Sequence, residues 1–354
     1  MEFSGNELRK LLPGVPLVES PFFDAILPTA GLDPETERVA RDLNRDGFAV
    51  IRFQDAEFDQ RAERIKEYLG RQFDAAAWRE QEWPRGHGRR YFDYWKENAD
   101  IRAIAANEQV LKLLGDLYGR KAFPFQTLNF PVGTQQHYHS DSIHFSSIPE
   151  RFMCGVWLAL EDIHEDAGPL VYYPGSHRWP IIYNDQIGTR ITGTTDTRDQ
   201  SMYEPYWRAM VETSNLKPQH FLPKKGEALI WMANLLHGGA RQNDPYRSRW
   251  SQVTHYFFAD CCYTTPMLSD YSVGRPFVRE MIDIASGAPV PNIYVDVPLA
   301  DLDYLAKNPR PPTDFDSERY LALNPDVAAA VAQGKTSAIE HFRHWGAKEG
   351  RRYR

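Results

Sequence analysis

A succession of short apolar runs, separated by Gly, Pro and Asn, begins at Ala122 and constrains the fold more than any other feature. The runs that have the character of strands are FPFQTLNF, FMCGVWLALED, GPLVYYPGS, EALIWM and RWSQVTHYFFA. Aromatic and β-branched residues of this kind are typical of strands. Several short strands with turn signals between them predict a β-sandwich or a barrel.

Helical patterns come before these strands. The segment LDPETERVARDLNRDGFAVI predicts a helix over about residues 33–45, an Asp-Gly break and a short strand over 48–53. Further helices are expected over 57–73 and 101–118, the second from apolar residues at helical spacing. The sequence therefore predicts a mainly β fold with flanking helices, in the α+β class.

Periodicity and proline content divide the chain into four parts. Residues 1–32 have weak periodicity and several prolines, which predicts an irregular lead-in before the main domain at 33–286. The proline-rich passage 287–312 cannot form one continuous helix and reads as a linker. Residues 313–354 predict a small module of short helices. Within the main domain, the insert at 185–210 interrupts the strands and is a candidate lid.

Helix signals in the last part are specific. Asn324 is predicted to cap a helix that has Pro325 at its first position, and Gly334 is predicted to end it. Ser337 with Glu340 three residues later forms a capping box for the final helix.

Size and charge exclude several classes of protein. A chain of 354 residues can hold one large domain with a small appendage. The net charge of -7, with basic and acidic residues interspersed, argues against a nucleic-acid-binding protein. Apolar runs such as MCGVWLAL are too short to span a bilayer, and the N-terminus lacks a signal-peptide pattern. Three cysteines, two of them adjacent, suggest no disulfide framework, so we expect a cytoplasmic protein with reduced thiols.

The stretch HYHSDSIHF, from His137, contains three histidines and an aspartate within nine residues. Residues two apart on a strand share a face, so His139 and Asp141 can bind one metal ion. One more histidine would complete a 2-His-1-carboxylate facial triad with open positions on a divalent metal. His237 is the best candidate, because it follows a predicted strand and precedes glycines that allow close backbone approach. His137 shares the face of His139, so a shifted set of ligands stays open.

A dicarboxylate cosubstrate would need a fixed cation beside such a metal. Arg249 lies 12 residues past His237 on the next predicted strand, where its guanidinium can hold a carboxylate by two hydrogen bonds. Arg247 lies on the same face and is a second candidate. The alternative is a set of polar residues on a solvated sheet face, but the joint pattern is more specific than any of its parts.

Four stretches together resemble the phytanoyl-CoA dioxygenase family of Fe(II)/2-oxoglutarate oxygenases, over about residues 33–262. They are HSD, FMCGVWLALEDIHEDAGPLVYYPGSHR, HGGARQN and RWSQVTHYF. The resemblance implies a double-stranded β-helix, which is a cupin-like jelly roll. It implies that iron binds to His139, Asp141 and His237, and that 2-oxoglutarate and O2 are cosubstrates.

The resemblance also assigns residues around the metal. Arg249 would bind 2-oxoglutarate, Asn129 would lie near this cosubstrate, and Trp157 would lie beside the pocket. Gly239 stands where some members have a serine, so a hydroxyl contact is lost there. Family members that halogenate lack the metal-binding carboxylate, so Asp141 implies hydroxylation or another C–H oxidation. A true cupin metal site is disfavoured, because Gly133 lies too close to the first histidine.

Candidates for binding the substrate are fewer and weaker. The basic and aromatic segment at 83–96 offers Arg90 and Tyr94, although a solvated loop explains the segment equally well. His144 is expected at the pocket mouth or on the surface, and Arg178, after PGSH, is a further candidate. The other members of the possible substrate wall are Arg85, Arg89, Tyr91 and Trp95. We expect His177 to be structural and the remaining histidines to lie at the surface: His87, His164, His220, His341 and His344.

The C-terminal segments YLALNPDVAAAV and AIEHFRHWGAKEGR resemble a helical module of bacterial polysaccharide-biosynthesis proteins. This resemblance favours a sugar or glycan precursor as the substrate, ahead of a secondary metabolite and an acyl-CoA. Three roles stay open for the module: binding a protein partner, self-association and stabilising the fold. A different class of function is a non-catalytic jelly-roll module that binds ligands or acts as an adaptor.

Overall fold

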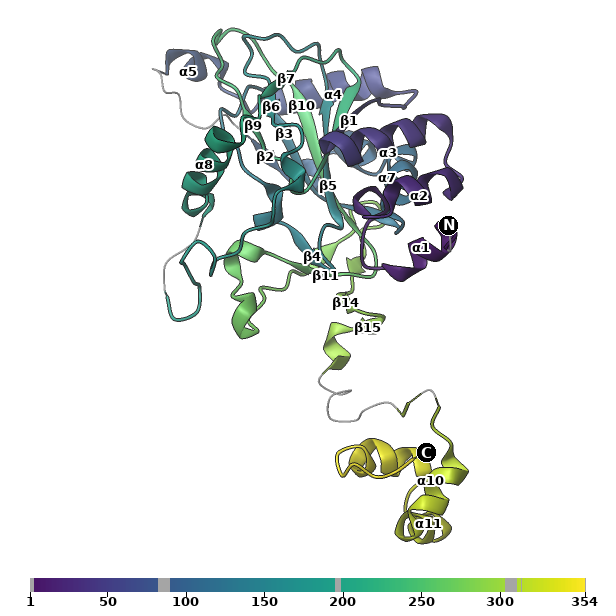
Figure 1. Ribbon diagram of the computed structural model, residues 1–354. Helices are drawn as coiled ribbons and strands as arrows, with labels where there is room; N and C mark the ends of the chain where they lie inside the picture. Colours follow the sequence, from purple (N-terminus) through teal and green to yellow (C-terminus); the bar gives the residue numbers. More distant parts are fainter. Residues whose placement is uncertain (1–2, 82–89, 195–198, 303–310, 313, 354) are drawn as a thin grey trace. The chain divides into compact units, whose positions relative to one another are not determined.

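The computed structural model describes residues 3–81, 90–194, 199–302, 311–312 and 314–353 (Figure 1). It separates into two compact units, Met1–Pro291 and Asn292–Arg354. Arg85, His87 and Arg89 of the predicted basic segment lie outside the described residues. None of the helices that the described residues form has the length and apolar character needed to cross a membrane.

The first unit contains two antiparallel sheets, as the short apolar runs predict. The larger has the strand order β1-β8-β5-β10-β3-β2, with bounds Phe48–Arg52, Glu227–Met232, Met153–Ala159, Ser251–Phe258, Ala122–Phe130 and Tyr91–Phe92. The smaller has the order β7-β6-β9, with bounds Gln219–Phe221, Leu170–Tyr172 and His237–Gly239. Two short ladders complete the unit, β4 (Ser146–Ile148) with β11 (Cys262–Thr264) and β12 (Met281–Ile282) with β13 (Pro289–Val290).

Alternation along the strands of the large sheet separates two cores. Val156, Leu158 and Ile230 pack in the core that the helices cover. Trp157 and Trp231 belong to a second core, which includes residues of the small sheet. The two sheets therefore face each other across an apolar layer, and the predicted jelly-roll core with flanking helices is confirmed.

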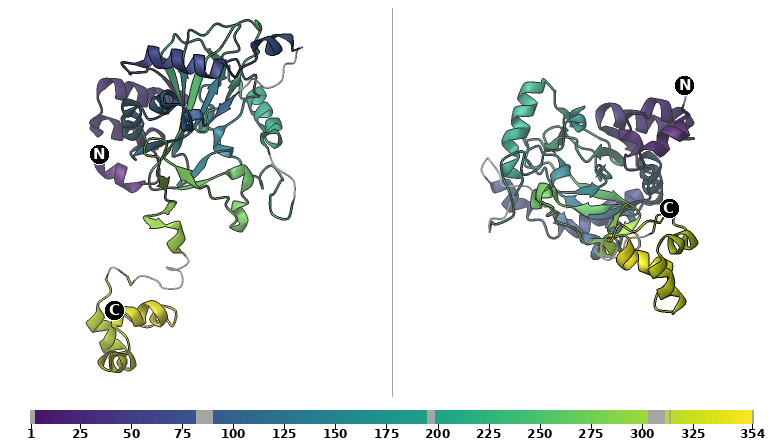
Figure 2. Two further views of the ribbon diagram at one scale, coloured as in Figure 1. Left: turned by 180° about the vertical axis from the view of Figure 1, so that it is seen from behind. Right: turned by 60° about the horizontal axis from the view of Figure 1, so that its bottom comes forward.

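Helices cover the large sheet (Figures 1 and 2), and two of them, α3 and α4, begin and end close to the predicted residues. Their bounds are Pro34–Asp46 for α3, Phe58–Gly70 for α4, Ala99–Ala105 for α6 and Glu108–Tyr118 for α7. The Asp33 side chain caps α3, and Gly47 ends it in the left-handed region. The single helix predicted over 101–118 is wrong, because Asn107 caps a new helix at that point.

The predicted irregular lead-in at 1–32 is also wrong. It contains α1 (Gly5–Leu11), which a Ser4–Glu7 capping box begins, and α2 (Phe23–Ile26). Short 3-10 turns occupy Leu17–Glu19 and Leu27–Thr29. Each of these elements is too short to produce a clear 3.6-residue period, and tertiary packing of Leu8, Leu17 and Ile26 stabilises them.

The insert at 185–210 ends in a helix. It forms a 3-10 turn at Gln200–Met202 and then α8 (Glu204–Ser214), which extends past the predicted end of the insert. The carboxylate of Asp270 accepts hydrogen bonds from the backbone N–H groups of Ile191 and Thr192 and so fixes the first part.

The second unit has its own small core of Tyr320, Val327, Ala338 and Phe342. Its elements are a two-residue ladder of β14 (Ile293–Tyr294) with β15 (Val297–Pro298), then α10 (Ser317–Leu323), α11 (Pro325–Ala332), α12 (Ala338–His341) and a π-helical turn at Phe342–Gly346. The predicted linker at 287–312 is thus structured in part, and the division into units falls at residue 291.

The helix signals of this unit were right in two of three cases. The Ser337–Glu340 capping box is present, and Gly334 adopts a φ of 68° just after α11. Asn324 stands at the start of α11, but its side chain does not cap that helix. Its amide instead donates hydrogen bonds to the backbone oxygens of Tyr320 and Arg352.

Candidate metal centre

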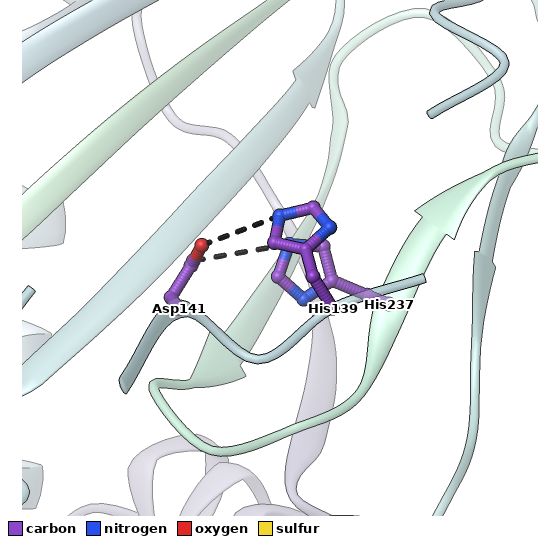
Figure 3. A group of neighbouring side chains, drawn as sticks. All are labelled: His139, Asp141 and His237. Carbon is purple, nitrogen blue, oxygen red and sulfur yellow. Dashed lines mark ion pairs between the residues drawn. The ribbon is translucent and has the colours of Figure 1, made fainter. Parts of the chain in front are cut away.

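The structure brings His139, Asp141 and His237 together as a buried group. Their ligand atoms all lie within 4.8 Å of one another, and their side chains converge (Figure 3). The shortest distances to the carboxylate are 3.6 Å from His139 Nε2 to Asp141 Oδ1 and 3.8 Å from His237 Nε2 to Asp141 Oδ2. Two imidazoles and one carboxylate are the facial triad of non-haem Fe(II) oxygenases.

Backbone hydrogen bonds set the two histidines side by side. His139 N donates to His237 O at 2.8 Å, and His237 N donates to His139 O at 3.0 Å. The Nδ1 atoms lie 3.0 Å from His137 O and 2.9 Å from Leu235 O, respectively. Because a carbonyl only accepts, each Nδ1 carries the proton and each Nε2 is left as the free ligand atom.

Asp141 reaches the same point from a different local structure. The prediction placed it on a strand with His139, but Asp141 begins a 3-10 turn that runs to Ile143. Ser140 fixes this turn, because its hydroxyl accepts from Ser142 N at 3.2 Å and donates to Asn234 Oδ1 at 2.9 Å. The strand argument was therefore wrong locally, although the residues meet as predicted.

The charges of the group suit a cation. Burial opposes the ionisation of Asp141, but the surrounding histidines, His237 first, outweigh it and hold the pKa of that carboxyl well below its usual range. Burial lowers the pKa of His237 to about 4, so this imidazole is neutral near pH 7. A neutral imidazole beside a carboxylate is the protonation state that a metal requires.

The three residues line a cavity of about 520 Å³ between the two sheets. This volume is within the range of small-molecule sites. The other lining residues used below are Arg90, Gln126, Phe130, Thr134, Gln136, His137, His144, Trp157, Leu170, Gln200, Ser201, Glu204, Trp231, Arg249 and His255.

Arg249 is buried in the wall of this cavity at 2% exposure. Its guanidinium lies over the rings of Phe130 and Trp157, at 5.4 and 5.5 Å. Nη2 has a long hydrogen bond of 3.5 Å to Val132 O, and Nε has no hydrogen-bond partner in the part of the chain that the structure describes. None of the described carboxylates forms an ion pair with it. Burial lowers the pKa of Arg249 to about 10, so it remains charged near pH 7. A buried cation with unused donors indicates an anionic ligand.

The alternative candidate, Arg247, is exposed and pairs with Asp244 at 3.2 Å on the protein surface. Of the two arginines, only Arg249 lines the cavity.

Comparison with known proteins identifies a family whose members are consistent with this site. The family model described as phytanoyl-CoA dioxygenase (PhyH) matches residues 43–249, which is more than half of the chain. The chain belongs to the phytanoyl-CoA dioxygenase family. The peroxisomal phytanoyl-CoA dioxygenase of Rattus norvegicus is 24% identical over 204 residues, which cover 54% of this chain and 55% of the rat enzyme. The chain thus spans about half the length of this relative.

Solved structures of similar fold come from nogalamycin biosynthesis. The non-heme alpha ketoglutarate dependent carbocyclase SnoK has a TM-score of 0.51 and 16% identity, covering 73% of this chain and 94% of that one. The epimerase SnoN, in complex with Fe3+, alpha ketoglutarate and nogalamycin RO, has a TM-score of 0.50 and 20% identity, covering 73% and 96%. These likenesses establish the fold.

The other predicted site residues fall into two groups, those that line the cavity and those that do not. Trp157, His144 and Arg90 line the cavity. His137 also lines it, but it does not belong to the metal-binding group, and its Nδ1 lies 2.8 Å from Tyr138 O. The ligand set that the resemblance implies is therefore the one that the structure assembles.

Asn129, Tyr94 and Arg178 do not line the cavity. Asn129 sits on the opposite face of β3, where its amide donates to Gln252 Oε1 at 3.2 Å. Tyr94 donates to Gln72 Oε1, and the exposed Arg178 donates to Asn44 O. Asn129 is excluded because its side chain lies on the other face of the strand. Tyr94 and Arg178 are excluded because their side chains form hydrogen bonds outside the cavity.

Most histidines outside the site lie where they were predicted. His177 is buried, with Nε2 3.2 Å from Asn44 O, which is a structural contact. His164, His220 and His344 are exposed. His341 is half-buried rather than at the surface, because its Nδ1 pairs with the Tyr320 hydroxyl.

The glycines after His237 are required by the close approach of another chain segment. A Cβ on Gly238 would lie 2.8 Å from Gln136 O. A Cβ on Gly239 would lie 2.5 Å from Thr134 Oγ1 and 2.7 Å from Gln135 N. A serine at position 239 would therefore not fit without movement of the segment at Thr134 and Gln135.

Among the polar residues that line the cavity, Trp231, His255 and Gln126 lie closest to the metal-binding group and were not predicted as part of the site. His255 Nε2 lies 3.6 Å from Asp141 Oδ2, and its Nδ1 pairs with Gln126 Oε1 at 3.0 Å. On β3, Gln126 and Leu128 line the cavity and Asn129 lies on the opposite face. The alternation of side chains along a strand was therefore the signal that would have indicated Gln126.

Proposed function

We propose that the protein is an Fe(II)/2-oxoglutarate-dependent dioxygenase that hydroxylates, or otherwise oxidises at C–H, a small polar substrate. One observation carries this proposal. A buried triad of metal ligands and a buried arginine without a carboxylate partner among the described residues line the same cavity. A ligand-binding module has no need for both.

The donor set fits iron. His139 and His237 offer Nε2 atoms, and Asp141 offers a negative charge, which leaves positions open for cosubstrates. Iron with 2-oxoglutarate supplies O2-dependent oxidation of an unactivated C–H bond. The chain would contribute the rest: Arg249 would hold and orient the dicarboxylate, and Trp157 and Phe130, whose rings lie against the guanidinium, would keep water from that end of the cavity.

The cavity rim supports a small polar substrate, and within that class we propose a sugar or glycan precursor. Gln136 Nε2 donates to Gln200 Oε1 at 3.1 Å, and Gln200 Nε2 donates to Glu204 Oε1 at 3.2 Å. Thr134 and Ser201 add hydroxyls to this wall. Such a row of donors and acceptors suits hydroxyl groups better than the long apolar chain of an acyl-CoA.

The substrate class is tested by 2-oxoglutarate turnover with a panel of nucleotide sugars and glycan precursors, followed by mass spectrometry of the products. A sugar that increases succinate release and is itself oxidised supports the proposal. The second candidate is a secondary metabolite, since SnoK and SnoN both belong to nogalamycin biosynthesis. Stimulation by polycyclic or acyl-CoA compounds alone would overturn the sugar assignment.

We further propose that the second unit acts in self-association or in binding a protein partner. Among the residues that the structure describes, those that line the cavity all belong to the first unit, so deletion of residues 313–354 is expected to leave iron binding and 2-oxoglutarate turnover within about twofold. Light scattering of the full chain and the truncated chain would report loss of an oligomer. A large loss of turnover on truncation would show that the module serves the active site.

A cytoplasmic location is part of the same proposal. Cys154, Cys261 and Cys262 are all free and buried, which is the pattern expected of a reducing compartment. Fractionation of the native host, with this chain detected by antibody, would test it.

A further inference from the structure

The two oxygens of Asp141 have different neighbours. The indole N–H of Trp231 donates to Asp141 Oδ2 at 2.8 Å, within the buried wall of the cavity. Asp141 Oδ1 instead faces His139 Nε2 at 3.6 Å, whereas His237 Nε2 and His255 Nε2 lie 3.8 and 3.6 Å from Oδ2. One oxygen of the carboxylate is thus engaged by the protein before any metal binds.

The indole is fixed in place from several sides. Trp231 on β8 pairs directly with Gly155 on β5, and the ring lies over that glycine. A Cβ at position 155 would fall 2.1 Å from Trp231 Cζ2 and 2.3 Å from Cε2, so only glycine leaves room for the ring. On its other side, the indole contacts the His237 ring, with centroids 4.9 Å apart. The ring has little freedom to turn its N–H away from the carboxylate.

We infer that Trp231 is a positioning residue that orients Asp141 and limits it to binding the metal through one oxygen. The inference rests on the proposed function, because it concerns the iron site. A carboxylate oxygen that accepts a short N–H bond has less electron density for a metal, so two-oxygen binding is disfavoured. One-oxygen binding keeps three positions free, which 2-oxoglutarate and O2 together require.

The first test is an anaerobic Fe(II) titration of the full-length apoprotein and of Trp231→Phe. Outer partners of metal ligands typically contribute about 10- to 100-fold in metal affinity, and we expect a loss of this size. At saturating Fe(II), the variant is also expected to bind 2-oxoglutarate more weakly, because the released carboxylate oxygen competes for a coordination position.

Trp78→Phe is the matched control. Its indole is also buried, at 5% exposure, and it donates to Gln242 Oε1 at 2.9 Å, outside the metal-binding group. If Trp231 were only a packing residue, both variants would lower the melting temperature and neither would change Fe(II) affinity. We expect Trp78→Phe to bind Fe(II) and 2-oxoglutarate like the wild type.

A second variant covers the case in which Trp231→Phe does not fold. The Trp231 side chain is replaced with its benzothiophene analogue, which keeps the bicyclic shape and has sulfur in place of the N–H. Loss of Fe(II) affinity in this variant supports the inference, and wild-type affinity in it, or in a folded Trp231→Phe, overturns it. If the wild-type protein itself binds no Fe(II), the proposed function fails instead.

Discussion

The Asp141→Ala variant is expected to lose Fe(II) binding and all 2-oxoglutarate turnover. The substitution removes the only negative charge of the triad and leaves two imidazoles, which alone hold Fe(II) less tightly than they do together with a carboxylate. The loss of Fe(II) affinity should be larger than the loss of about 100-fold that is typical when a residue hydrogen-bonded to a metal ligand is replaced. Anaerobic titration with Fe(II), read by bound metal after gel filtration, measures it.

His164→Ala is the control for this experiment. His164 is an exposed histidine beside Asp166, with a 3.6 Å contact that resembles an ion pair of the site but lies outside the metal-binding group. It should bind Fe(II) like the wild type. Undiminished Fe(II) binding by a folded Asp141→Ala variant would show that the metal is held elsewhere.

The Arg249→Ala variant is expected to bind Fe(II) normally but to need at least about 100-fold more 2-oxoglutarate. The guanidinium can make two hydrogen bonds to a carboxylate, and each hydrogen bond to a charged group contributes about 1.5–3 kcal/mol. Arg249→Lys should be intermediate, because it keeps the charge but not the planar pair of donors. The measurement is 2-oxoglutarate affinity of the Fe(II)-loaded protein under anaerobic conditions.

Arg247→Ala is the matched control, since it removes an exposed arginine two positions away. It should leave 2-oxoglutarate affinity unchanged. The opposite pattern, with Arg247→Ala impaired and Arg249→Ala intact, would contradict the assignment. The melting temperature of the Arg249→Ala apoprotein is a second measurement. Because the substitution removes a buried charge that has no carboxylate partner among the described residues, it should not lower the melting temperature by the amount typical of a core substitution.

The sequence predicted the large features of the fold because its strands and long helices carry clear periodicity. The strands at Ala122–Phe130 and Ser251–Phe258 were found from their aromatic and β-branched residues. The short elements of the lead-in were missed, because their stability comes from packing and not from a local pattern.

Within the site, the grouping of His139, Asp141 and His237 was predictable because few other roles explain His-x-Asp with a distant His and Arg. Asn129 was misplaced because the face that a strand residue presents depends on register. On β3, Asn129 pairs with Gln252 of β10 and its side chain lies on the face away from the cavity, which only the assembled sheet reveals. Trp231 was missed because a tryptophan in an apolar run has the pattern of a core residue, and only the tertiary structure brings its N–H to Asp141.

The most direct test of the metal and cosubstrate site is an anaerobic titration of the wild-type apoprotein with Fe(II) and then 2-oxoglutarate, followed by visible absorption. We expect a weak charge-transfer band that appears only when both are present and saturates with one of each per chain. Absence of the band, with Fe(II) bound weakly or not at all, would contradict the oxygenase assignment and favour a non-catalytic binding module.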